Sequence, residues 1–242
     1  MSAANQIDRI TWHGVFCGIY AAIPISLGVA PIGVVYGLTA IDRGLTPLEA
    51  IMTSAMIFGG ASQFLAIELW DHPLPVLSLL LTVLAANLRH LVMGAALAPW
   101  LRHVRAGRAY PCLYFMSDHM WGLMMHLQRT GPTPQFGVML GSGIFFYLTW
   151  VGATAIGALF GAVVTQPDVY GLDVLGVSFF IALLVTFWSG PEDILPWVSA
   201  ATASVIAVQF VDNGINILIG AGVGVAVGVW RDHRKSSVTK NI

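Results

Sequence analysis

The run PLPVLSLLLTVLAANLRHLVMGAALAPW, residues 73–100, decides the class of this protein. It is longer than the roughly 20 apolar residues that a membrane-spanning helix needs, and its one charged side chain, Arg89, lies near the middle. A guanidinium at the bilayer midplane costs roughly 2.5 kcal/mol or more, and intramembrane ionisable residues mark functional sites by default. The run therefore predicts a spanning helix with a functional arginine.

Composition places the whole chain among integral membrane proteins. Of the 242 residues, 57% are apolar and 10% are charged, against about 25% charged residues in soluble domains. The apolar runs cover residues 14–41, 47–69, 73–100, 135–166, 174–190, 194–210 and 214–230. We predict an all-α, polytopic helical bundle of about seven transmembrane helices, within a range of about five to eight. The connections are short, so we expect one transmembrane domain over residues 1–242, with an N-terminal segment 1–13 and a polar tail 231–242.

Several function classes and features are disfavoured by the residues present. A net charge of −1 without a concentrated basic patch argues against a nucleic-acid partner. No Gly-x-x-x-x-Gly-Lys-Ser/Thr string is present, so any energy is expected from an ion or substrate gradient or from a partner. No cofactor is expected. Cys17 and Cys112 lie in or beside apolar runs, where thiols behave as small hydrophobes, and no disulfide is expected. We also expect no removable signal peptide, because its basic and small-residue signals are missing.

Positive charges predict the orientation of the chain. Three arginines lie in the loop 102–108 and four Lys or Arg residues lie in the tail 231–242, so both segments are expected in the cytoplasm. Seven full spans fit if the less apolar segment 110–128 enters and returns on the cytoplasmic side, which puts the N-terminus outside. An eighth span through that segment, or a break of the first run at Pro24 and Pro31, would change whether the number of crossings is odd or even, and with it the side of the N-terminus.

Glycines at four-residue spacing predict close helix contacts. Such glycines are Gly33 and Gly37, Gly137 and Gly141, and Gly157 and Gly161. Packing inside this chain is their ordinary explanation. The last run carries three in register, Gly220, Gly224 and Gly228, and we expect this stripe to contact another subunit.

The string FGGASQF, residues 58–64, is unusual inside an apolar run. Gly59 and Gly60 each weaken a helix by about 1 kcal/mol relative to alanine, so they predict local unwinding. Unwound backbone at membrane depth is tolerated only where it is buried in protein or lines a wet cavity. The alternative is a close helix crossing, with Ser62 and Gln63 bonded to a neighbouring helix.

The string at residues 58–64, followed by NLRHLVMG at residues 87–94, resembles the AzlC family, the large subunits of branched-chain amino acid exporters. The resemblance extends to Pro24, Pro31, Gly33 and Gly44-Leu45, and to the length and hydropathy of the chain. It implies a multi-pass secondary transporter of the bacterial inner membrane that exports branched-chain, small apolar amino acids. It also implies a partner, a small membrane subunit of the AzlD type.

Arg89 needs an anion, carbonyl groups or water, because an unpaired buried charge is costly. Among the carboxylates considered, Glu68, Asp118 and the pair Glu192-Asp193, we favour Asp118, the only carboxylate within the moderately apolar segment 110–128. In the resembled family an acidic pair often follows a Ser or Thr after the basic loop. Here the string is Ser117-Asp118-His119, so no role of a second acid is carried over. A purely structural clamp between Arg89 and Asp118 is the alternative to substrate binding or coupling.

The candidate substrate-binding or coupling residues are Ser62, Gln63, Asn87, Arg89, His90 and Asp118. An amino acid substrate needs an anion-binding group for its carboxylate, such as Arg89 or an unwound helix N-terminus. Its ammonium group needs oxygen atoms, which polar side chains and the backbone at Gly59-Gly60 would offer. His90, His119 and Asp118 are the groups able to carry a proton.

Two other functions are open. A membrane channel or scaffold subunit would share the composition of a transporter. An intramembrane metal-binding protein would use His119 and His126, seven residues apart, with Asp118 and His90, although the tight spacing of specific metal motifs is missing. The prediction is a transporter that is not an enzyme and binds no metal.

Overall fold

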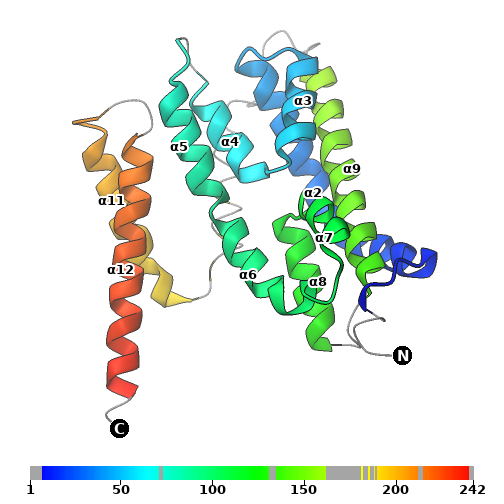
Figure 1. Cartoon of the computed structure of the whole chain (residues 1–242). Helices are drawn as coiled ribbons and strands as arrows, with labels where there is room; N and C mark the ends of the chain where they lie inside the picture. The colour runs from blue at the N-terminus through cyan, green and yellow to red at the C-terminus, as the bar shows by residue number, and fades with distance from the viewer. Residues whose placement is uncertain are drawn as a thin grey trace. The chain divides into compact units, whose positions relative to one another are not determined.

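The computed structural model describes residues 7–70, 73–130, 135–161, 190–211 and 215–239, together with Ile181, Val185 and Trp188. Within these ranges the chain is helical and contains no strand, as predicted (Figure 1). The helices are α2 (Trp12–Asp42), α3 (Pro47–Ile57), α4 (Gly60–Glu68), α5 (Val76–Asn87), α6 (Arg89–Leu101), α7 (Ala106–Leu113), α8 (Asp118–Thr130), α9 (Phe136–Gly161), the short η3 (Pro191–Asp193), α11 (Ile194–Ala207) and α12 (Ile215–Thr239).

The chain divides into two compact units, Met1–Phe64 with Asn87–Gly176, and Leu65–Ala86 with Val177–Ile242. Among the described residues, three helical stretches are long and apolar enough to cross a membrane: α2, Val76–Leu101 and α9. The predicted span 174–190 lies largely outside the described residues. The seven-helix count and the single domain therefore stay predictions.

Helices α2 and α9 form the scaffold of the first unit, where they lie side by side (Figure 1). Their backbones touch: a Cβ added at Gly18 would overlap the Val138 carbonyl, and one at Gly157 would overlap the Val34 carbonyl. The predicted packing glycines all lie in this contact, namely Gly33, Gly37, Gly137, Gly141, Gly157 and Gly161. Their spacing correctly predicted close helix contacts.

Helix α2 is continuous through Pro24 and Pro31, so the predicted break at these prolines is wrong. A proline removes a backbone N–H and costs about 3 kcal/mol or more in a helix interior. Neighbouring helices offset this cost in membrane bundles. Here the contact with α9 clamps α2 on both sides of the prolines, at Gly18 before them and at Gly37 after them.

The run 47–69 is not one crossing, because α3 ends at Ile57 and α4 begins at Gly60. Gln63 Nε2 donates to Ser54 Oγ at 3.0 Å. In one straight helix these residues would be separated by about 13.5 Å along the axis, beyond the reach of their side chains. The chain therefore doubles back at residues 58–59 and forms a re-entrant hairpin, the α3–α4 hairpin.

A second re-entrant hairpin comes from the opposite end of α2. Its first limb, α7, begins beside Asp8, where Arg108 Nη1 lies 3.4 Å from the carboxylate. It ends at Tyr114, whose ring centroid is 6.0 Å from that of Tyr147, midway along α9. The second limb, α8, ends at Thr130, and Gln135, five residues later, accepts a hydrogen bond from Thr11 Oγ1 at the start of α2 at 3.0 Å. The segment 110–128 thus enters and returns as predicted, forming the α7–α8 hairpin.

The start of α2 lies on the same side as the basic loop 102–108. Asp8 pairs with Arg105 at 3.6 Å and with Arg108 at 3.4 Å. The predicted placement of the N-terminus on the opposite side is therefore wrong. The physical reason is the α3–α4 hairpin. The run 47–69 returns to the side from which it came, so the number of crossings is one fewer than predicted.

In the second unit, α12 packs against α11 through its glycines. A Cβ at Gly220 would lie 2.7 Å from the Ala200 carbonyl oxygen, and one at Gly224 would lie 2.9 Å from Ala200 Cβ. At Gly228 the nearest atom is Pro196 Cγ at 3.9 Å. The prediction that this stripe contacts another subunit is therefore wrong, because the stripe is covered by the chain's own helix, as small-residue stripes commonly are.

We expect Gly157→Val to destabilise the first unit, because the new side chain would overlap the Val34 carbonyl. Overpacking of this kind typically costs about 1–3 kcal/mol, which should lower the melting temperature of the purified protein in detergent. Gly152→Val is the matched control, since a Cβ at Gly152 on the same helix meets nothing within 4 Å. Equal melting temperatures for the two variants would contradict the close contact of α2 with α9.

Candidate functional site

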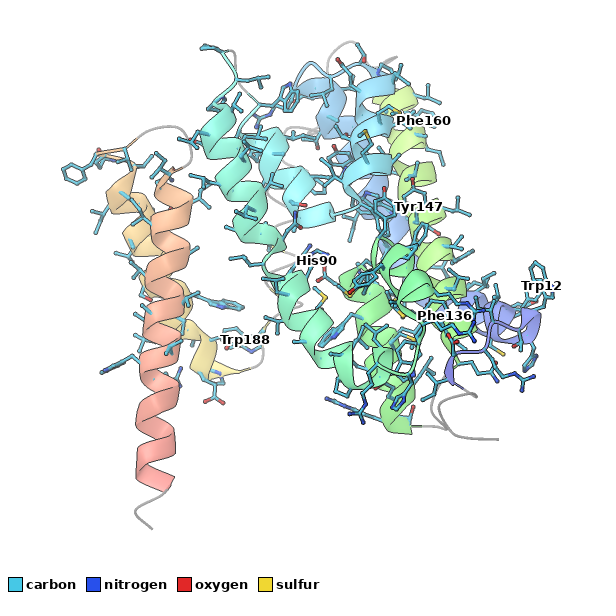
Figure 2. All side chains as sticks on the ribbon, viewed as in Figure 1. Trp12, His90, Phe136, Tyr147, Phe160 and Trp188 are labelled. Carbon is cyan, nitrogen blue, oxygen red and sulfur yellow. The ribbon has the colours of Figure 1, made fainter. Side chains whose placement is uncertain are left out.

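Three helix interruptions surround one cavity in the first unit. They are the turn at residues 58–59, the interruption at Leu88 and the bend at residues 114–117. The cavity has a volume of about 380 Å³, within the range of about 300–1,000 Å³ for small-molecule sites. Its lining residues are Ile57, Phe58, Asn87, His90, Leu113, Tyr114 and Met116 (Figure 2 labels His90).

Phe58 makes the turn at the first interruption. Its φ of 44° is left-handed, a conformation that is unusual for a bulky residue and costs about 1–3 kcal/mol. The surroundings hold it there: its N–H donates to the Ser54 carbonyl at 3.2 Å, and its ring packs edge-on against Tyr147 with centroids 5.2 Å apart. Strained backbone persists only where packing fixes it in place. Such residues cluster at functional sites.

The glycine pair beside Phe58 serves close approach. A Cβ at Gly59 would lie 2.5 Å from Ser62 Oγ and 3.5 Å from Asn87 Oδ1. A Cβ at Gly60 would lie 3.0 Å from the Trp150 ring. The helix is interrupted at residues 58–59, as predicted, and Gly60 begins α4. The close packing of the alternative is present as well, because Gly60 lies against Trp150 of α9 and Gln63 bonds the same residue.

Side chains bond the carbonyl groups that the interruptions leave open. The Ala55 carbonyl, one turn before Phe58, accepts a hydrogen bond from the Tyr147 hydroxyl at 3.0 Å and another from the Tyr114 hydroxyl. His90 Nδ1 lies 3.2 Å from the Asn87 carbonyl oxygen. Backbone at membrane depth requires such partners, because lipid offers none.

Ser62 and Gln63 hold the α3–α4 hairpin together. Ser62 Oγ donates to the Gly59 carbonyl at 2.8 Å. Gln63 donates to Ser54 and accepts from Trp150 Nε1 at 2.9 Å. Both side chains are buried, with exposed fractions of 0% and 1%. Their contacts are internal and do not line the cavity, so a role in substrate binding stays a prediction for them.

Sequence reasoning missed several members of this buried polar network. Ser54 Oγ lies 2.8 Å from Thr154 Oγ1 and so ties α3 to α9. The Tyr36 hydroxyl lies 2.8 Å from Thr53 Oγ1 and ties α3 to α2. Isolated polar residues within apolar runs were the available signal, although the sequence does not say which of them meet.

Arg89 pairs with Asp118, the partner chosen from the sequence. Arg89 Nη1 lies 2.9 Å from Asp118 Oδ2, and the two side chains are 23% and 33% exposed. Arg89 Nε is buried and has no hydrogen-bond partner among the described residues. The pair joins the first turn of α6 to the first turn of α8. Neither side chain lines the cavity, but each lies within two residues of one that does.

The predicted site residues therefore separate into three groups. Asn87 and His90 line the cavity, Arg89 and Asp118 form the ion pair next to it in the chain, and Ser62 and Gln63 belong to the buried network. In the ranges that the structure covers, no three His, Cys, Asp or Glu side chains come together as a metal site. The metal set of His90, Asp118, His119 and His126 does not assemble.

Residues 24–164 match the family described as "AzlC protein". The match covers more than half of the chain and includes the cavity, the ion pair and both hairpins. The chain belongs to the AzlC family. This membership confirms the resemblance carried by residues 58–64 and 87–94.

Three relatives each match about two thirds of the chain. An "uncharacterized membrane protein" from Archaeoglobus fulgidus is 29% identical over 174 residues, which is 69% of this chain and 73% of the relative. The "branched-chain amino acid transport protein AzlC" of Bacillus subtilis is 26% identical over 166 residues, or 69% of this chain and 65% of the relative. The "inner membrane protein YgaZ" of Escherichia coli is 26% identical over 174 residues, or 68% and 71%. No solved structure matches the chain.

We expect the two tyrosines on the Ala55 carbonyl to act together. Tyr147→Phe or Tyr114→Phe alone leaves one hydroxyl on this carbonyl, so each should cost only about 0.5–1.5 kcal/mol. The double variant removes both hydroxyls from this carbonyl and should cost more than the sum of the two. Thermal unfolding of the four proteins measures this coupling, with Tyr110→Phe, which alters a 73% exposed side chain, as control. Strictly additive losses would contradict the shared bond.

Proposed function

We propose that this protein is an inner-membrane secondary transporter that exports branched-chain, small apolar amino acids together with a small AzlD-like membrane subunit. The observation that carries the proposal is the cavity at which three helix interruptions meet, with two polar residues and five apolar or aromatic ones in its lining. Discontinuous helices around a central site are typical of secondary transporters. The name of the Bacillus subtilis relative supports the substrate class, since it is a branched-chain amino acid transport protein.

The residues around the cavity suit a zwitterion with an apolar side chain. Arg89 keeps one buried donor, Nε, free of its bond to Asp118, and a substrate carboxylate is the anion that this donor would bind. Asn87 Oδ1 is an acceptor at the cavity wall that would bind the ammonium group. The remaining lining residues would contact an aliphatic side chain, whose transfer out of water is favourable.

The two hairpins supply the moving parts of this proposal. The α3–α4 hairpin and the α7–α8 hairpin reach the cavity from opposite ends of α2, and the Tyr114 bond to the Ala55 carbonyl joins them. Breaking that bond and withdrawing one hairpin would change the side from which the cavity is reached. Alternating access needs two such states around one site.

The chain carries no nucleotide-binding string of the P-loop type, so the proposed energy source is an ion or substrate gradient. His90, Asp118 and His119 are the groups near the cavity that would carry a coupled proton. The AzlD-like subunit is part of the proposal because the AzlC family resemblance implies it. The glycine stripe of α12 is not its binding surface, since α11 already covers that stripe.

Efflux of labelled leucine from proteoliposomes tests the proposal, with the chain reconstituted alone and with its small partner. Arg89→Lys keeps a cation opposite Asp118 but loses Nε, so we expect efflux to fall by at least about tenfold while the protein still folds, since lysine lacks the guanidinium fork. Arg102→Lys, in the exposed basic loop, is the matched control and should transport like the wild type.

The same assay separates the other functions. A carrier saturates with leucine concentration and prefers branched-chain amino acids over alanine and glutamate, whereas a channel does neither. A scaffold subunit gives no efflux in either reconstitution. Full activity of Arg89→Lys would contradict the role of Arg89 in binding the substrate.

A further inference from the structure

The lining of the cavity is chemically divided. Its polar members, Asn87 and His90, both flank the interruption before α6. The wall from the α7–α8 hairpin consists of Leu113, Tyr114 and Met116, and the Tyr114 hydroxyl is already bonded to the Ala55 carbonyl. A ligand therefore meets hydrogen-bonding groups on the wall formed by Asn87 and His90, here called the α6 wall. On the hairpin wall it meets only hydrocarbon, sulfur and an aromatic ring.

This division orients an amino acid in the cavity. Its carboxylate and ammonium groups need hydrogen-bonding partners, because leaving a buried charge unpaired is costly. Those partners are on the α6 wall and at the adjacent Arg89. The side chain of the amino acid must then point toward the hairpin wall.

We propose that Leu113 and Met116 determine which apolar side chain the cavity accepts. The proposal rests on the proposed function and deepens it by assigning specificity to the tip of the α7–α8 hairpin. The backbone of the tip is a tight turn, in which the Met116 N–H donates to the Leu113 carbonyl at 3.0 Å. This turn presents both side chains to one wall, and Met116 is only 6% exposed.

The other apolar lining residues are less suited to set size. Phe58 is fixed by its left-handed backbone and by its packing on Tyr147, so replacing it would disturb the turn itself. Ile57 is 42% exposed and does not confine a ligand closely. Leu113 and Met116 have no such backbone constraint, and their side chains can be shortened while the turn remains.

Met116→Ala and Leu113→Ala should therefore enlarge the site toward bulkier substrates. Proteoliposomes loaded with equal amounts of labelled valine and phenylalanine measure the ratio of the two efflux rates. Pockets discriminate apolar side chains that differ by a methylene by about 10-fold or more, so we expect each variant to raise the phenylalanine-to-valine ratio by about tenfold. Met116→Phe should lower transport of leucine relative to alanine.

Met124→Ala is the matched control, because Met124 is a fully buried methionine of the same hairpin that does not line the cavity. It should change total efflux without changing the ratio. Stabilisation of the purified variants by added valine or phenylalanine, measured as a shift in melting temperature, gives the same ratio where a variant transports poorly.

The outcomes separate this inference from the proposed function. Unchanged ratios in both alanine variants, with saturable valine efflux retained, would overturn the assignment of specificity to the hairpin and leave the transporter intact. Absence of saturable amino acid efflux in the wild-type protein would overturn the proposed function and this inference with it.

Discussion

Backbone groups that leave a helix at membrane depth must find partners inside the protein, and this constraint organises the first unit. The carbonyl of Ala55 is bonded by Tyr114 and Tyr147, and the carbonyl of Gly59 is bonded by Ser62. Lipid cannot replace these bonds, since each unsatisfied backbone group would cost several kcal/mol in hydrocarbon. The side chains that satisfy the backbone also tie the re-entrant hairpins to each other and to α9, so the interruptions are stable features of the fold.

The contact of α2 with α9 forms the support against which these hairpins pack. Glycines such as Gly18 and Gly157 bring two long helices into backbone contact, and the two hairpins reach this helix pair from its two ends. The hairpin tips then meet beside Tyr147, at the middle of α9. A cavity at such a meeting point changes shape when either hairpin moves, which is the kind of site that the proposed alternating access needs.

Local chemistry was predictable from the sequence, whereas the pairing of surfaces was only partly so. The adjacent Gly59 and Gly60 weaken a helix by themselves, and Arg89 demands an anion, so the unwinding and the ion pair with Asp118 followed from single residues. Pro24 misled because its cost in an isolated helix is offset by a partner, α9, that local sequence does not reveal. The stripe at Gly220 misled for a similar reason, since four-residue spacing indicates a close contact but not whether the neighbour is in the same chain.

The central claim is that the run 47–69 returns to its own side of the membrane, and side-specific thiol labelling tests it most directly. In a background with Cys17→Ser and Cys112→Ser, single cysteines are placed by Ile10→Cys before α2, Gly107→Cys in the basic loop and Asp42→Cys at the far end of α2. A membrane-impermeant maleimide is applied to intact cells and to inverted vesicles. The structure predicts that Ile10→Cys and Gly107→Cys react from one side and Asp42→Cys from the other. Reaction of Ile10→Cys and Gly107→Cys from opposite sides would contradict the re-entrant α3–α4 hairpin.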